Sequence, residues 1–559
     1  MTSIPLKLML PRWTKRVATE GGRDPLGLSR VAFMITDYLL SGIVTTTDRA
    51  RYYSFYIWAL WHIANEEQPE NFQEFVNAFR RREAAMALAT LAADESASPV
   101  GVDATRNYFA SGIATGSFDC NFQVLPSNRL GGYGQYYAGS LYKLRLMEGS
   151  EAGLDCVTPG AADELAQSFH SSIVGTPYVK KRLFLETKIP KNDLMNSSES
   201  LSLDALQESF TSDERNRLTQ ILFGLNEADK GKEDAIVRRK TLTLLLHIIS
   251  EFEQTGNFAV AERANHGFYT DEYLLYPTYY GCLWPSENKT YPYTPPKPLM
   301  LCNNLWRQLC LHEFFCQAIE DYLCAVLEAA GAANEGLPGG SIAQNFIDDD
   351  FQSFLSSATG KESSSPARLL SALGITSSPN EEFSLACQKK LSPKHRVSES
   401  QILALKATNA AEQAARATLM LVVLYGKWRG ITKDSAFMYV AHKANAELWT
   451  GQVLPFLDRW LEPSLTWATA LEPLLEQFVI NQHDRVFYEK GNLRSVWLKR
   501  ADRRIFKEQD YEPVWRNSRI SNCVRIMADL KLVTIDEERA VSITAAGTRL
   551  MKKLLQDES

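Results

Sequence analysis

Residues 510–555 carry the pattern that most restricts how this chain can fold. Pro513 is expected to open a helix, because apolar residues recur at helical spacing after it. Two short β-branched runs follow, 532–535 and 540–543, joined by a polar turn. A last helix is expected over residues 544–555, with Thr544 as its N-cap. The apolar stripe of the first helix consists of Ile520, Cys523, Val524, Met527 and Leu530.

This order of helix, hairpin and helix resembles the winged helix-turn-helix modules of bacterial regulators, as does the run from Ile543-Thr544 to Gly547 and Leu550. The resemblance implies an outward helix face whose short polar groups reach phosphates or base edges. It also places Arg539 where a wing reaches the DNA backbone.

A net charge of −6 excludes a chain that is basic throughout, so any nucleic-acid contact must come from a local patch. Such a patch precedes and enters the tail, where basic residues outnumber acids. The expected nucleic-acid-binding residues are Lys499, Arg500, Arg503, Arg504, Arg516, Ser518, Arg519, Ser521, Asn522, Arg525 and Arg539. Winged helices in multi-subunit machines also dock on proteins, and Asp529 on the polar face favours that use. DNA contact and protein docking both stay open.

The rest of the chain predicts a mainly α protein, a multi-helical body with a small C-terminal winged-helix (α+β) module. Helical spacing of apolar residues continues through most segments, whereas candidates for strands before the tail are few. Five segments are expected: an N-terminal helical domain with some irregular or β structure (1–190), a central helical domain (191–340), a flexible or loop-rich connector (341–400), a helical domain with a basic end (401–507) and the winged-helix module (508–559).

The nine cysteines include no C-x-x-C pair, which argues against a zinc ribbon and a disulfide framework. Cys302, Cys310, Cys316 and Cys324 are expected to be small buried residues of one helix. No apolar run reaches the length of a membrane span, and the N-terminus lacks the apolar core of a signal peptide. A cytoplasmic protein without a membrane partner is expected.

Residues 24–61 carry a second resemblance. Gly27-Leu-Ser29 leads into a helix, and after a short turn come Arg49-Ala-Arg-Tyr-Tyr-Ser-Phe55 and Trp58. This order is similar to the opening of a group of uncharacterised bacterial proteins found in mobile-element and phage-defence gene neighbourhoods. The resemblance implies a defence context and supplies no catalytic motif.

Two constellations resemble nuclease signatures. Arg307 and His312 have the Arg-x4-His spacing of a helical RNase type, in which His acts as acid and base and Arg stabilises phosphorane charge. Glu186 and Lys188 resemble the second half of a metal-dependent nuclease motif, but no upstream acid completes it.

Two acidic patterns could also serve as metal sites. His442, His483-Asp484 and Asp529 follow the order of helical phosphohydrolases, although Asp529 belongs to the tail helix. The run 348–350 of three aspartates is more simply a solvated, helix-capping loop. Neither pattern assigns a metal ligand.

The leading hypothesis is a non-enzymatic subunit of a bacterial multi-protein, DNA-directed system, with anti-phage defence as the context that the family resemblance implies. The tail would contact DNA, partner subunits or both, while the body would bind a catalytic partner such as an ATPase or a nuclease. No cofactor is expected. The alternative is a nuclease or toxin effector, with Arg307 and His312 as the first pair to test.

Overall fold

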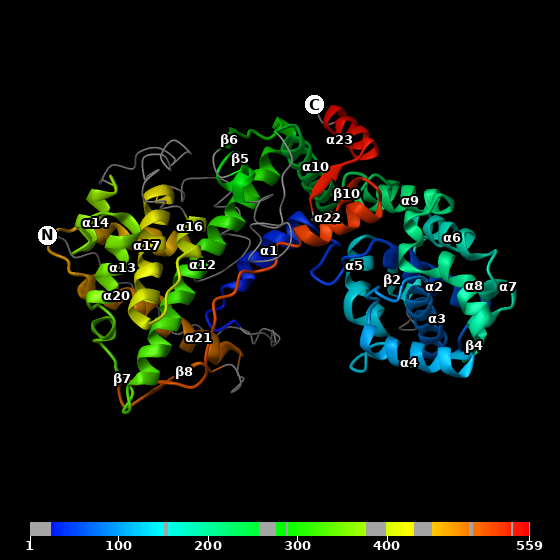
Figure 1. The fold of residues 1–559 in the computed structure, drawn as a ribbon, viewed down its shortest axis with the longest axis horizontal. Coiled ribbons are helices and arrows are strands. Elements are labelled where there is room, and N and C mark those ends of the chain that lie inside the picture. The colour runs from blue at the N-terminus through cyan, green and yellow to red at the C-terminus, as the bar shows by residue number, and fades with distance from the viewer. Residues whose placement is uncertain are drawn as a thin grey trace. The chain divides into compact units, whose positions relative to one another are not determined.

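The computed structural model describes residues 24–149, 155–255, 275–286, 289–375, 399–429, 450–490, 496–537 and 540–557. Helices account for 65% of the structure and strands for 7%, which confirms the mainly α fold class (Figure 1). The chain divides into two compact units. Unit 1 comprises residues 1–32 and 309–516, and unit 2 comprises residues 33–308 and 517–559. Each unit combines two distant stretches of sequence, which differs from the five consecutive segments expected.

Unit 2 is built on the aromatic helix α2, which packs on α6 and α3, while α3 also packs on α8. Tyr53, Tyr56 and Trp58 of α2 are fully buried. Their rings contact Tyr137 and Phe169, so the aromatic helix forms the core of this unit. Within its described residues, unit 2 contains the helices α2 (Arg51–Glu66), α3 (Phe72–Ala93), α4 (Val102–Thr115), α5 (Ala138–Lys143), α6 (Ala161–Ile173), α7 (Pro177–Lys180), α8 (Lys191–Leu201), α9 (Ser212–Leu222), α10 (Glu233–Thr255), α22 (Ile520–Asp529) and α23 (Ala545–Asp557).

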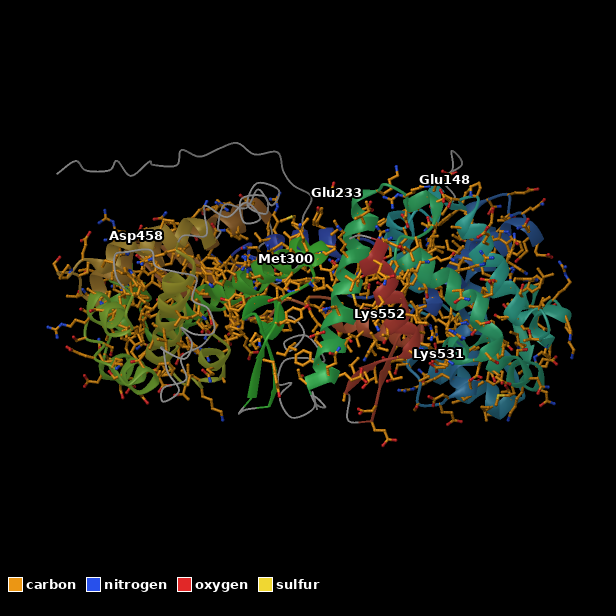
Figure 2. All side chains as sticks on the ribbon, turned by 90° about the horizontal axis from the view of Figure 1, so that it is seen from above. Glu148, Glu233, Met300, Asp458, Lys531 and Lys552 are labelled. Carbon is orange, nitrogen blue, oxygen red and sulfur yellow. The ribbon has the colours of Figure 1, made fainter. Side chains whose placement is uncertain are left out.

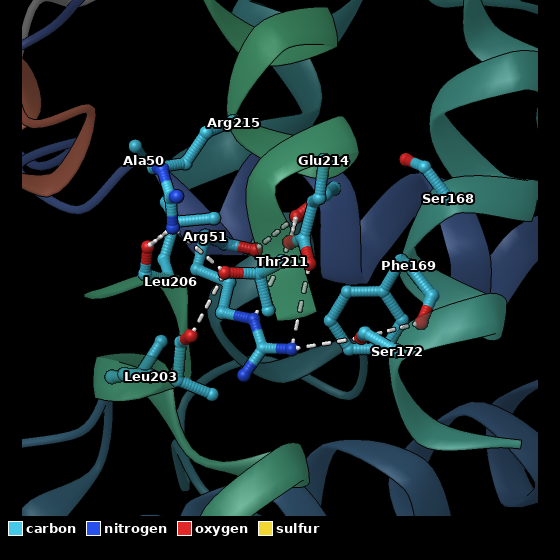
Figure 3. A network of polar contacts seen from close by, with 12 residues as sticks. Ala50, Arg51, Ser168, Phe169, Ser172, Leu203, Leu206, Thr211, Glu214 and Arg215 are labelled. Carbon is cyan, nitrogen blue, oxygen red and sulfur yellow. Dashed lines mark hydrogen bonds and ion pairs between the residues drawn. The ribbon is translucent and has the colours of Figure 1, made fainter. Parts of the chain in front are cut away.

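A buried ion pair joins α2 to α9 (Figure 3). The Nε of Arg51 lies 3.3 Å from Glu214 Oε1, and both side chains are fully buried. Arg51 also donates to the Ser202 carbonyl, and the Ser54 hydroxyl donates to Glu214 over 2.5 Å. These bonds satisfy both charges away from water, which is the condition under which a buried ion pair is tolerated.

Unit 2 contains four small antiparallel sheets of two strands each among its described residues. They pair β1 (Ser117–Asp119) with β4 (Lys188–Pro190), β2 (Met147–Gly149) with β3 (Asp155–Val157), β5 (Cys282–Ser286) with β6 (Lys289–Pro292), and β10 (Val533–Ile535) with β11 (Val541–Ile543).

The Ser-rich segment 192–211 contains most of α8 and two 3-10 turns. Ser197 donates its hydroxyl proton to the Asp193 carbonyl, and Ser198 donates to that of Met195. Leu194 and Leu201 are buried. The serine hydroxyls therefore bond back to the helix, and burial of the leucines decides the conformation that composition left undetermined.

Unit 1 is organised around α17 (Ala410–Trp428), on which α13, α16 and α19 pack. Ala414, Ala415 and Ala417 are fully buried, and their small side chains suit close helix packing. The other helices of unit 1 are α13 (Asp349–Thr359), α14 (Pro366–Ala372), α16 (Glu399–Ala404), α19 (Thr450–Phe456), α20 (Trp467–Leu475) and α21 (Asn481–Lys490). The division between the units falls within α1 (Ser29–Leu39) and α12 (Met300–Ala332). The four cysteines of α12 are buried, as expected.

The tail does form a helix, a hairpin and a helix, but its first helix begins at Ile520 and not at Pro513. Before it, the backbone N–H groups of Val514 and Arg516 donate to the carboxylates of Glu320 and Glu313. Those bonds replace the first turn of a helix, so the segment stays extended. Within unit 2, α23 and β11 then pack on α10.

Candidate nucleic-acid interface

The basic run 499–507 folds as a β-hairpin of unit 1. Strand β8 (Leu498–Ala501) pairs with β9 (Arg504–Lys507), and β9 pairs with β7 (Leu337–Pro338). The two-residue turn has positive φ at Asp502 (50°) and Arg503 (61°), as a type I′ hairpin turn requires. This turn matches the twist of the strands, so it fixes the position of the basic residues at the tip.

The register assigns the hairpin two different faces. Leu498 and Ile505 are 1% exposed and belong to the face that packs on unit 1. Lys499 and Phe506 are cross-strand neighbours on the opposite face. An exposed lysine beside a half-buried aromatic ring therefore occupies the outer face.

Some cations of the hairpin are bound to their own unit. Arg500 donates to Asn481 Oδ1 over 2.8 Å and pairs with Glu476 and Asp484. Arg504 Nη1 donates to the Gly336 carbonyl over 3.0 Å. These two guanidiniums hold the hairpin in place, and the carboxylates of Glu476 and Asp484 compensate the charge of Arg500.

Lys499 and Arg503 differ from their neighbours. Both are exposed, and neither forms an ion pair with any residue in the part of unit 1 that the structure describes. Of the eleven residues predicted to bind nucleic acid, these two have the geometry of phosphate contacts.

The tail presents a different picture, because four of the predicted contact residues, one on α22 and three just before it, are buried. Arg516 is 6% exposed, Ser518 2%, Arg519 5% and Asn522 5%. The Arg516 guanidinium pairs with Glu320 over 2.5 Å. Arg519 and Asn522 donate to the carbonyls of Ile43 and Val44, over 3.1 and 2.9 Å. The prediction that these four side chains face a nucleic acid is therefore wrong for this conformation.

The polar face of α22 is instead a contact within unit 2. Asp529 accepts hydrogen bonds from Arg49 Nε (3.1 Å) and the Ala50 N–H (2.8 Å). Arg525 is half exposed and pairs with Asp48 over 2.7 Å. Ser521 is partly exposed, whereas Arg539 lies outside the described residues. The polar face of α22, which was predicted to contact DNA, thus binds the loop between α1 and α2.

A second group of cations was not singled out from sequence. Arg549, Lys552 and Lys553 are exposed on the last helix, α23, and share one face by their spacing. Lys552 is labelled in Figure 2. Alternation of these cations with the buried Met551 and Leu554 was the signal that could have revealed this face.

The catalytic candidates are occupied by structural contacts. His312 is fully buried in unit 1, where its Nε2 lies 2.8 Å from the Leu28 carbonyl. Burial lowers its pKa to about 3, which removes it as an acid at neutral pH. The backbone N–H of Trp497 donates to His483 Nε2 over 3.2 Å, so that nitrogen has no lone pair for a metal.

The acidic patterns behave in the same way. Asp348 caps α13 by accepting from the Phe351 N–H over 3.0 Å, as expected of a capping residue. Glu186 and Lys188 are both exposed beside β4. His442 lies outside the described residues. Among the residues that the structure describes, no group of three or more His, Cys, Asp or Glu side chains is positioned to hold a metal ion.

No helix in the described ranges has both the length and the apolar composition of a membrane span. Comparisons with protein-family models, with curated proteins and with solved structures found no match to this chain.

Proposed function

We propose that this chain is a non-catalytic subunit that holds nucleic acid by sequence-independent phosphate contacts from the β8–β9 hairpin. The observation that carries the proposal is the pair Lys499 and Arg503, exposed on a rigid type I′ hairpin without an intramolecular counter-ion among the described residues. Phosphate contacts of this kind supply affinity and position without reading sequence.

The shape of the hairpin suits this role. The major groove of DNA admits a two-stranded β-ribbon, and Arg503 lies at the turn that would enter first. Arg500 and Arg504 anchor the strands to α21 and to the segment before β7, so the backbone that carries Lys499 and Arg503 is already held in place when a phosphate approaches. Less conformational entropy is then lost on binding.

The tail is proposed to be a winged-helix-like module that serves attachment within the protein. Its order α22, β10, β11 and α23 supports the resemblance, and the engagement of Asn522 and Asp529 by residues 44–50 supports the docking use. Under this proposal the fold of a DNA reader is retained while its reading face is used for packing.

The system served is proposed to be a bacterial, multi-protein, DNA-directed one with a role in phage defence. What supports the defence context is the resemblance of residues 24–61 to proteins of defence neighbourhoods. A catalytic partner such as an ATPase or a nuclease would bind the helical body.

The test compares DNA retention by the wild type and by Lys499→Gln combined with Arg503→Gln, using fluorescence anisotropy of a labelled duplex over a salt series. Loss of two phosphate contacts should lower the slope of log affinity against log salt by about 1.8. Lys552→Gln combined with Lys553→Gln is the matched control, because it removes the same charge from α23. A slope unchanged by the hairpin variant, or lowered equally by the control, contradicts the proposal.

A further inference from the structure

A buried arginine in unit 2 lacks enough negative charge around it. Arg82 of α3 is fully buried, and its Nη1 lies 2.6 Å from Glu67 Oε1. Glu67 is shared, because Arg81 Nη2 lies 2.5 Å from its other oxygen. One carboxylate therefore faces two guanidiniums, and burial lowers the pKa of Arg82. The net charge of this group is therefore positive, and one more anion would balance it.

Arg82 also has an unused donor. Its Nη groups bond Glu67, the Ala78 carbonyl and His62, but its buried Nε–H has no hydrogen-bond partner among the described residues. The hydroxyl of Tyr178, 1% exposed, is likewise unpartnered in the described part of unit 2. Leaving such groups unpaired costs free energy, because each buried donor has lost its bond to water.

These side chains surround one ring, that of Phe184. The Arg82 guanidinium carbon lies 5.1 Å from its centroid. The ring centroids of His62 and Tyr178 lie 4.5 and 6.3 Å from it. Three polar side chains, from α2, α3 and α7, thus contact the same aromatic ring.

Two histidines complete the cluster as hydrogen-bond donors. Arginine and tryptophan can only donate, so His62 Nδ1 accepts from Arg82 Nη2 (2.9 Å) and His170 Nδ1 accepts from Trp58 Nε1 (3.3 Å). Each neutral ring therefore carries its proton on Nε2. The two rings lie 5.7 Å apart, and the described residues offer neither Nε2–H an acceptor.

The electrostatics agree with neutral rings. Burial, reinforced by Arg82, lowers the pKa of His62 to about 3, and burial lowers that of His170. A protonated Nε2 has no lone pair for a metal ion, so the cluster is unsuited to a cation.

From these contacts we propose that His62, Arg82, His170 and Tyr178 form a binding site for one small oxyanion, with inorganic phosphate as the best-matched ligand. Every unused group can donate a hydrogen bond, and the local charge is positive. A water molecule would satisfy some donors but would leave the charge of Arg82 uncompensated. Because His62, Arg82 and Tyr178 are at most 2% exposed, a ligand larger than a small free anion would not reach them.

This site lies in unit 2 and does not depend on the nucleic-acid proposal for the hairpin of unit 1. Isothermal titration of the full-length chain with inorganic phosphate, sulfate and acetate, in a chloride buffer, tests it directly. Wild type should bind one anion per chain, phosphate and sulfate more tightly than acetate, because they offer more acceptor oxygens.

Tyr178→Phe keeps the ring and removes only the hydroxyl. It should weaken phosphate binding about tenfold, as expected for loss of one hydrogen bond to a charged ligand. Tyr488→Phe, at a tyrosine that is 78% exposed, is the matched control and should bind like the wild type. Arg82→Met should abolish binding, and if that variant fails to fold, Tyr178→Phe still decides the matter.

Two results would overturn the proposal. One is the absence of any phosphate or sulfate binding up to about 10 mM, where a millimolar site would be saturated. The other is binding that Tyr178→Phe leaves unchanged, since the anion would then lie elsewhere.

Discussion

Asp529 stabilises the start of the aromatic helix α2 from a position remote in sequence. Ala50 precedes α2 and offers no side-chain cap, so the helix N-terminus needs an acceptor from elsewhere. Asp529 Oδ2 accepts from the Ala50 N–H over 2.8 Å and from Arg49 Nε over 3.1 Å. The last residue of α22 thus accepts a hydrogen bond from the N-cap residue of α2 and ties the tail helix to the start of the aromatic helix.

The cost of Asp529→Ala follows from these two bonds. Loss of an N-cap costs about 1 kcal/mol. Arg49 retains its bond to Asp204, whose side chain is 49% exposed, so loss of the better-buried partner adds about 1–2 kcal/mol, below the cost of stranding a fully buried charge. We expect a decrease of about 2–3 kcal/mol in the free energy of unfolding of unit 2.

Urea unfolding followed by hydrogen-exchange mass spectrometry measures this decrease. Two units can unfold in separate transitions, and the exchange protection of peptides from α2 reports on the stability of unit 2 alone. Glu537→Ala, in the exposed turn of the tail hairpin, is the control and should lie within about 0.5 kcal/mol of wild type. If Asp529→Ala is as mild as the control, or if protection of α2 is unaffected, the capping argument is wrong.

Two further predictions concern buried carboxyls of unit 2. Glu83 is buried with a pKa raised by burial from 4.5 to about 7, so the unfolded chain ionises first as pH rises. Wild-type stability should therefore fall by about 3 kcal/mol between pH 4.5 and 7 relative to Glu83→Gln, and parallel pH curves from thermal or urea unfolding would refute this. Glu214→Ala leaves the buried charge of Arg51 without its partner and should lower the free energy of unfolding by about 3–5 kcal/mol. The double variant Arg51→Met with Glu214→Leu removes both charges and should recover most of that loss. Urea titration compares the two variants, and equal stabilities would contradict the argument from an unpaired buried charge.

Local patterns sufficed wherever the deciding interactions are local. The capping role of Asp348 and the burial of the cysteines of α12 follow from spacing and side-chain type, and both are confirmed. The order of helix, hairpin and helix in the tail was also legible, because strands and helices impose different periods on the same few residues. The sequence by itself therefore determined the order of the elements in the tail, whereas bonds from Val514 and Arg516 to distant glutamates decided where its first helix begins.

Tertiary structure decided which faces are available. A polar residue such as Asn522 satisfies its amide equally well with a base edge, with water or with the Val44 carbonyl, and nothing local distinguishes these partners. The same is true of His312, whose acceptor is supplied by the distant Leu28. Contacts of large sequence separation also make the units discontinuous. The chain's own sequence thus specified its helices, while packing between distant segments decided that the polar face of α22 is buried and that the β8–β9 hairpin is exposed.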